Sequence, residues 1–274
     1  MRKSFAVASI FLLILFLYPA AAQTEDSVNV DQKVKVPRFE VSVNGIYAFL
    51  ETNLRFEGPG GFLGLNLNME DHMGLAKYKM MPVFTGKVNI KSRHSIFVMY
   101  YSLPRSSSFI IDKSFEFNGK VIDINTQVDT YFNMNVGSIG YMYDVIRDTK
   151  SHLGLFVNFY YISLKTGVSS NQEILNEDVW LKAPLPNIGA ESHYNFGKRF
   201  GVSGLISIFF LSFDDVSGSM HTLSTQMDFL LWPWLELGLG YYWFDLNLEV
   251  EDNQFTGIMD YTYQGPYVGL GFRF

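Results

Sequence analysis

The final segment of the chain constrains the fold more than any other stretch. It reads Tyr-Val-Gly-Leu-Gly-Phe-Arg-Phe over residues 267–274. Because successive side chains of an extended strand point to opposite faces, the apolar residues gather on one face and the small or polar residues on the other. The apolar face holds Val268, Leu270, Phe272 and Phe274, and the opposite face holds Gly269, Gly271 and Arg273. A strand with two such faces fits between lipid on one side and a barrel interior on the other.

This segment resembles the terminal strand of integral outer-membrane β-barrels of Gram-negative bacteria, in which alternating apolar residues end on a C-terminal aromatic residue. The resemblance implies that Val268, Leu270, Phe272 and Phe274 form an assembly signal, which the barrel-assembly machinery reads during biogenesis. It also implies an outer-membrane location, with the lipid bilayer and lipopolysaccharide as the surroundings.

A second targeting feature lies at the N-terminus. Arg2 and Lys3 precede an apolar stretch over residues 5–17, and Ala20-Ala21-Ala22 forms an A-x-A cleavage site. The apolar stretch is shorter than the roughly 20 residues that a membrane-spanning helix needs, although an uncleaved anchor is the alternative. No Cys follows the site, so no lipoprotein is expected. We expect a cleaved signal peptide at residues 1–22 and one outer-membrane β-barrel domain at residues 23–274.

The composition fits a membrane barrel better than a soluble exported protein. Aromatic residues make up 16% of the chain and charged residues only 18%. Beyond the signal there is no run of about 18 apolar residues, and a barrel spans lipid without one. The absence of Cys excludes disulfides and thiolate metal sites, and the formal net charge of −6 argues against nucleic acid as a partner. We expect no cofactor and no metal, since the acidic run at residues 249–253 lacks the spacing of a calcium loop.

Apolar residues recur at every second position in many segments, which is the period of a strand. The clearest segments cover residues 39–49, 80–90, 186–196, 223–231, 235–243 and 268–274. Residues 94–104, 153–165 and 200–213 are apolar on both faces for part of their length. Within residues 130–145 the apolar phase changes, which predicts a β-bulge near Gly137. We predict an all-β fold, an antiparallel up-and-down transmembrane barrel of about ten strands, with eight or twelve as alternatives.

The connections between these segments alternate in length. Short ones cover residues 89–93, 146–151, 197–199 and 232–234, and mostly longer ones cover residues 51–78, 106–129, 166–183, 214–219 and 251–257. Short periplasmic turns and long extracellular loops are typical of a transmembrane barrel. Within the first long connection, residues 66–75 are expected to form a short helix above the rim. A soluble, lipocalin-like barrel is the alternative, but the non-apolar strand faces carry mainly Gly, Ser, Asn and Thr rather than the charges of a water-facing exterior.

Aromatic residues gather near the expected membrane edges, where rings with polar tips are favoured. They are Tyr100, Tyr101, Tyr160, Tyr161, Trp232, Trp234, residues 241–244, Tyr261 and Tyr263.

The faces opposite the apolar ones place several charges in the predicted lumen. They are Glu40, Lys87, Glu191, His193, Asp228, Glu236 and Arg273. An unpaired charge in a narrow lumen is unfavourable, so these side chains are expected to pair with one another. We favour a set of salt bridges that holds a small barrel shut over a polar relay or a selectivity lining, and a wide diffusion pore is not expected.

The functional prediction is an outer-membrane barrel with a narrow or plugged lumen, serving small-solute passage in a porin-like way or envelope structure. No enzyme activity is expected. The first alternative is an outer-membrane enzyme at the extracellular rim, by analogy with omptin proteases and lipid A deacylases, with candidates in Asp214, Asp215, Ser217, Ser219 and His221. The other is a surface-binding, adhesin-like barrel that uses its long loops. His72 is expected to be a solvated loop residue, and His94 and His152 are expected at periplasmic turns.

Overall fold

The computed structural model describes residues 36–58, 62–110, 115–117, 120–122, 125, 127–170, 177–213, 216–252 and 255–274. The expected signal peptide, residues 1–22, lies outside the described residues. The chain divides into two units, Met1–Lys35 and Val36–Phe274, and the second contains all of the described residues.

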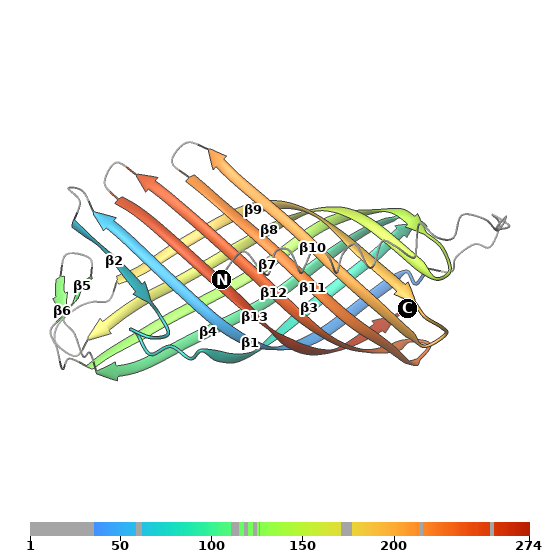
Figure 1. Ribbon diagram of the computed structural model, residues 1–274, viewed down its shortest axis with the longest axis horizontal. Coiled ribbons are helices and arrows are strands. Elements are labelled where there is room, and N and C mark those ends of the chain that lie inside the picture. The colour runs from blue at the N-terminus through green and yellow to red at the C-terminus, as the bar shows by residue number, and fades with distance from the viewer. Residues whose placement is uncertain are drawn as a thin grey trace. The chain divides into compact units, whose positions relative to one another are not determined.

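Ten strands form a closed antiparallel barrel, as the sequence predicts (Figure 1). They are β1 (Phe39–Gly58), β3 (Tyr78–Lys91), β4 (His94–Ile110), β7 (Gln127–Arg147), β8 (Ser151–Ser170), β9 (Glu177–Asn195), β10 (Phe200–Phe213), β11 (Val216–Trp232), β12 (Leu235–Asp252) and β13 (Phe255–Arg273). Each strand pairs with the next one along the chain, and β13 closes the barrel against β1 from Glu40↔Arg273 to Glu57↔Thr256. Among the described residues no helix is long and apolar enough to cross a membrane.

The short connections lie where the sequence predicts them, at residues 92–93, 148–150, 196–199 and 233–234. We call the barrel end that carries them the turn end, and the opposite end the loop end. Several of the predicted long connections are mostly strand instead. The loop-end link between β10 and β11, for example, covers only residues 214–215, which lie outside the described part of the chain.

The long connection between β1 and β3 contains an additional short strand. β2 (Phe62–Asn68) pairs with the loop-end part of β1, from Asn53↔Asn68 to Gly58↔Phe62. A turn and irregular backbone follow at residues 69–77, so the helix predicted over residues 66–75 is wrong. Two further short strands, β5 (Phe115–Phe117) and β6 (Lys120–Ile122), form a separate hairpin.

An apolar belt surrounds the turn-end half of the barrel. The side chains that the alternation assigns to lipid point outward and are exposed, including Val41, Val43, Met80, Phe84 and Leu270. Outward aromatic residues border the belt, with Tyr100, Tyr161 and Tyr241 exposed at its loop-end edge and Trp232 and Trp234 at the turn end. The girdle prediction is wrong for Tyr101, Tyr160, Phe244, Tyr261 and Tyr263, which are buried, and for Tyr242, which packs against the core. Neighbouring strand positions face opposite ways, so only one member of each adjacent pair reaches the lipid boundary.

On the loop-end side of the belt, the apolar side chains of the strands face inward and the polar side chains face outward. On β7 the inward side chains are Val128, Thr130, Phe132, Met134 and Val136, whereas the outward side chains change from polar Asn133 and Asn135 to apolar Ile139 and Tyr141. The pairing passes through Gly137 without interruption, opposite Tyr100 and Tyr161. The bulge predicted there is therefore wrong, and the only register shift between β7 and β8 falls between Asp144 and Ile146. The apolar phase changes because the strand leaves the apolar belt, with no extra residue.

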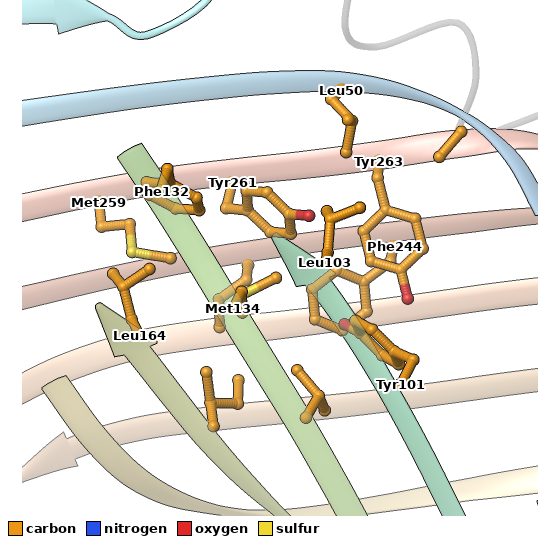
Figure 2. Packing of buried hydrophobic residues seen from close by; sticks show 14 of the residues in the cluster. Leu50, Tyr101, Leu103, Phe132, Met134, Leu164, Phe244, Met259, Tyr261 and Tyr263 are labelled. Carbon is orange, nitrogen blue, oxygen red and sulfur yellow. The ribbon is translucent and has the colours of Figure 1, made fainter. Parts of the chain in front are cut away.

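The interior of the loop-end half is a packed apolar core, which we call the chamber. Figure 2 shows Tyr101, Leu103, Phe132, Tyr261 and Tyr263 pointing toward one another from opposite walls of the barrel. The rings of Tyr263 and Phe244 stack with centroids 4.9 Å apart, and those of Phe132 and Tyr261 stack 6.0 Å apart. A barrel of this size is only wide enough for side chains to fill its interior, and these side chains fill it.

The hydrogen-bonded wall has a gap between β3 and β4. Their pairing runs from Lys91↔His94 to Val83↔Tyr101 and stops there, although β3 continues to Tyr78 and β4 to Ile110. β2 pairs with β1 and not with β4 among the described pairings. On the loop-end side of Tyr101, the edge of β4 that faces β3 is therefore covered by other means than a strand ladder.

Candidate functional site

The predicted lumen charges lie together inside the turn end. Lys87 Nζ lies 3.2 Å from Glu191 Oε1, and His152 Nε2 lies 3.2 Å from the same oxygen. Glu40 Oε1 accepts a hydrogen bond of 2.8 Å from Asn89 Nδ2, and Asn89 Oδ1 accepts one of 2.7 Å from Ser95 Oγ. Each carboxylate in this group has a partner on a neighbouring strand.

A second polar group lies on β9 to β13. His193 Nδ1 lies 3.0 Å from Ser203 Oγ and 3.5 Å from Asp228 Oδ2, and Ser203 Oγ donates to Asp228 at 2.5 Å. Glu236 pairs with Arg273. The imidazole rings of His152 and His193 stack at 5.8 Å and so connect the two groups.

Sequence reasoning missed several members of this network. His152 is the second residue of β8 and faces the lumen, whereas the sequence assigned it to a turn. Asp144 is fully buried and pairs with Arg147. The predicted strand at residues 153–165 began one residue after His152, and Asp144 lay within the predicted strand at residues 130–145 but was not counted among its inward residues. His94 lies at the start of β4, 2.6 Å from the Tyr141 hydroxyl, next to the predicted turn.

The chamber contains a segment that does not belong to the barrel wall. We call residues 69–77, between β2 and β3, the plug. Met69, Met73 and Leu75 of the plug are each 2% exposed or less and pack in the same core as Tyr101 and Leu103. The plug is fixed at its two ends, by hydrogen bonds of Met69 N to Thr52 O at 2.9 Å and of Leu50 N to Lys77 O at 2.8 Å. It also lies against the free edge of β4, since a Cβ at Gly74 would come within 2.9 Å of Ser107 Oγ.

A buried ion pair holds the plug in the chamber. Arg105 Nη1 lies 2.5 Å from Glu70 Oε1, and the two side chains are 1% and 2% exposed. Arg105 Nη2 donates to Thr52 Oγ1 at 2.7 Å, while the Thr52 N–H donates to Glu70 Oε2 at 2.8 Å. The guanidinium lies over the Phe132 ring, 4.7 Å from its centroid. Sequence reasoning missed this pair, although Arg105 has the same strand parity as the inward Tyr101 and Leu103, which is a usable signal.

The opposite side of the plug is solvated. Asp71 and Lys77 form an ion pair of 2.6 Å on the surface, with both side chains about half exposed. The hydrogen bond from Lys77 and the lysine's charge lower the pKa of Asp71, and the same bond raises the pKa of Lys77. Solvent screens such a pair, so it contributes little to holding the plug. His72 is exposed, as expected, and its Nδ1 accepts a hydrogen bond of 3.1 Å from the Asn68 N–H.

The rim candidates of the sequence are not brought together as predicted. Asp214 and Asp215 lie outside the described residues. His221 and Ser219 share the outer face of β11, and His221 Nδ1 lies 3.8 Å from Asp245 Oδ2 on β12. Asp245 Oδ1 also accepts a hydrogen bond of 2.7 Å from Thr262 Oγ1. Ser217 Oγ instead lies 3.4 Å from Glu249 Oε2. Within the described ranges, no three His, Cys, Asp or Glu side chains are grouped as a metal site.

The predicted assembly residues line the outer face of β13 at the closing seam. Val268, Leu270 and Phe274 are exposed, and Phe272 stacks on Trp234 at 6.1 Å. The Phe274 N–H donates to Phe39 O at 2.8 Å, so the last residue still belongs to the closing ladder between β13 and β1.

The geometry matches a known class of fold. The outer membrane protease OmpT from Escherichia coli is similar, with a TM-score of 0.51 and 11% identity over 89% of this chain and 99% of that chain. This chain has the fold of a Gram-negative outer-membrane β-barrel. The translocator domain of the autotransporter NalP from Neisseria meningitidis gives a TM-score of 0.48 at 7% identity, over 100% of this chain and 98% of that chain. No protein-family model and no curated protein matches the sequence.

The outer surface agrees with this fold. A closed barrel with a belt of outward Val, Ile, Leu and Phe side chains requires a lipid environment, and the fold points to the outer membrane.

Proposed function

We propose that this barrel has a lumen that is closed at rest and serves the passage of small solutes. The observation that supports this proposal is that side chains fill the lumen at both ends of the barrel. The ion pairs around Lys87, Glu191 and Asp228 occupy the turn end, and the plug with the aromatic core occupies the loop end. A barrel of about ten strands filled in this way leaves no room for a wide diffusion pore.

The plug favours passage over a purely structural role in the envelope. The ladder between β1 and β13 closes the sheet, and the plug covers the gap between β3 and β4 without being part of a strand. The plug is held by the Glu70–Arg105 pair and by backbone bonds at its ends, and it can leave the chamber without breaking the ladder between β1 and β13. A cover that is held by side chains and by its two ends, and not by a strand ladder, suits a barrel that opens better than a purely structural one.

Conductance across a planar lipid bilayer tests the proposal. The wild-type protein should stay closed, whereas a variant that combines M69S, M73S and L75S in the plug with K87A and E191A at the turn end should conduct. The faster migration of the unboiled sample on a detergent gel shows that each protein is folded. Steady wild-type conductance would exclude a closed lumen. A folded variant that never conducts would exclude passage and leave envelope structure as the role.

A second candidate function, hydrolysis at the outer wall, is supported by one specific observation. His221 lies next to the Asp245 carboxylate and between the rings of Phe210 and Trp243, at 5.4 and 6.4 Å. Ser219 lies on the same face two positions away. A histidine oriented by a carboxylate is the usual base for a serine nucleophile. Loss of p-nitrophenyl octanoate hydrolysis in both S219A and H221N, with S217A unchanged, would support this activity, and absence of turnover by the wild type would exclude it for this ester.

A further inference from the structure

The buried ion pair of the chamber is already a carboxylate-binding site. The Glu70 carboxylate accepts one hydrogen bond from Arg105 Nη1 and one from the Thr52 N–H, at 2.5 and 2.8 Å. Both donors belong to wall strands, β4 and β1, while the carboxylate belongs to the plug. The wall strands therefore supply the carboxylate-binding site, which we call the receptor, and the plug supplies the carboxylate that occupies it.

The rest of the occupant is apolar. Beside Glu70, the plug inserts Met69, Met73 and Leu75 into the aromatic core, each almost completely buried. One carboxylate with an adjoining apolar surface is the chemistry of an amphiphilic monocarboxylate. When the plug leaves, it vacates a space lined by apolar side chains with a guanidinium at its wall.

The receptor also has donors that the plug does not use. Among the described residues, Arg105 Nε and the Tyr261 hydroxyl have no hydrogen-bond partner although both atoms are buried. Tyr261 lies close to the guanidinium, because its ring stacks on Phe132, which lies under Arg105. Buried donors without a partner are rare in folded proteins. Arginine binds a free carboxylate best through two parallel N–H groups, and Glu70 engages only Nη1. A ligand that uses Nε as well makes a contact that the plug leaves unmade.

We propose that the chamber binds an amphiphilic monocarboxylate, and that Glu70 with its apolar neighbours occupies the same site as an internal competitor. The inference rests on the proposed function, a barrel that is closed at rest and passes small solutes. It names the class of solute that displaces the plug. A single carboxylate matches the single guanidinium, whereas a dianionic phosphate would bring one negative charge too many into an apolar chamber. A neutral alcohol would leave Arg105 without a counter-ion.

Competition sets the expected affinities. The apparent dissociation constant is the intrinsic one divided by the fraction of molecules whose site is vacant. The substitution Glu70→Gln removes the competing charge and leaves the plug length unchanged. It should therefore tighten carboxylate binding at least tenfold, because the free guanidinium then depends on the ligand for its counter-ion. Glu51 is the matched control, since it is the outward, exposed glutamate next to Thr52 on β1.

Isothermal titration calorimetry of the full barrel in detergent provides the test, with octanoate as the probe. Octanoate should bind the wild type, bind E70Q at least tenfold more tightly, and bind E51Q like the wild type. The double variant E70Q/R105Q should lose the binding, and acetate and octan-1-ol should bind at least tenfold more weakly than octanoate. Equal affinities for octanoate and octan-1-ol, or unchanged octanoate binding in E70Q/R105Q, would overturn the inference.

A spin label at the plug keeps the test independent of these variants. The chain has no Cys, so A76C introduces a single labelling site on an exposed residue of the plug. Octanoate should raise the mobility of this label in an otherwise wild-type chamber, and an unchanged spectrum at saturating octanoate would contradict displacement. Binding without conductance would refute passage alone, and conductance without binding would refute the carboxylate site alone.

Discussion

The buried pair between Glu70 and Arg105 gives the sharpest stability prediction. Replacing Arg105 with Met keeps a long apolar side chain but leaves the Glu70 carboxylate in the chamber without its cation. Removing one partner of a buried pair costs about 3–5 kcal/mol. The cost should lie near the lower end, about 3 kcal/mol, because Glu70 keeps its hydrogen bond of 2.8 Å from the Thr52 N–H. The double variant E70L/R105M removes both charges and should lie within about 1 kcal/mol of the wild type.

Reversible urea unfolding, followed by the fluorescence of the four tryptophans, measures both quantities. With a slope of about 2 kcal/mol per molar urea, R105M should lower the midpoint by about 1.5 M, and E70L/R105M should restore most of it. Detachment of the plug is the alternative way to relieve the unpaired carboxylate. Cleavage by trypsin after the exposed Lys77 should then increase in R105M and return to the wild-type rate in the double variant. If R105M changes neither the midpoint nor the cleavage rate, or if the double variant is as unstable as R105M, the assigned role of the pair is wrong.

Three further predictions concern the turn end of the barrel. Phe274→Ser should lower the amount of folded protein in the outer membrane, measured by the unboiled gel band, and normal levels would argue against an assembly signal in the terminal strand. Among the described residues, Lys87→Met leaves the inward Glu191 with His152 as its ionic partner, so it should destabilise the barrel by about 1–3 kcal/mol in urea, and K87M/E191Q should recover part of this loss. At the turn after β7, partial burial raises the pKa of Asp148, but hydrogen bonds from the Lys150 and Ser151 N–H groups and the Ser151 hydroxyl outweigh it and lower the pKa below the usual aspartate value. Because the folded pKa is the lower one, the stabilisation is complete above the unfolded pKa and disappears as pH falls through the folded pKa. Asp148→Asn should therefore flatten the acid limb of the stability curve below about pH 4, and an unchanged acid limb would contradict this.

The sequence predicts the barrel well where the apolar face of a strand is the face that lies against lipid. Within the apolar belt, Val41 and Val43 on β1 and Leu270 on β13 face lipid as their alternation indicates. The paired arrangement of β1 and β13 also follows from the need to close every strand edge in lipid. The strand number of ten follows from the short turns, which can be recognised without knowing the strand faces.

The same rule fails at the loop end because the environment changes there. Val136 and Ile139 are both apolar, yet one faces the chamber and the other faces lipid, so a reader of the pattern infers a bulge that the strand does not contain. Arg105 was missed for a related reason. The alternation assigns it to the interior, but a charged side chain in a Ser-rich segment is normally read as a loop residue. Its partner Glu70 lies in a turn, where no periodic pattern predicts which side chains point inward.

The switch of the apolar face from outward to inward along the strands also determines how deeply the protein lies in its membrane. Sinking the barrel by one residue pair, about 7 Å, would carry outward polar side chains such as Glu51, Asn135 and Asp245 into hydrocarbon. Rising by the same distance would expose outward side chains such as Leu239, Phe84 and Ile139 to water. Both displacements are unfavourable on strands all around the barrel, so the strands together determine the depth of the protein in the membrane. The membrane surface is held at the level of Tyr100, Tyr161 and Tyr241, and the plug lies on the loop-end side of that level.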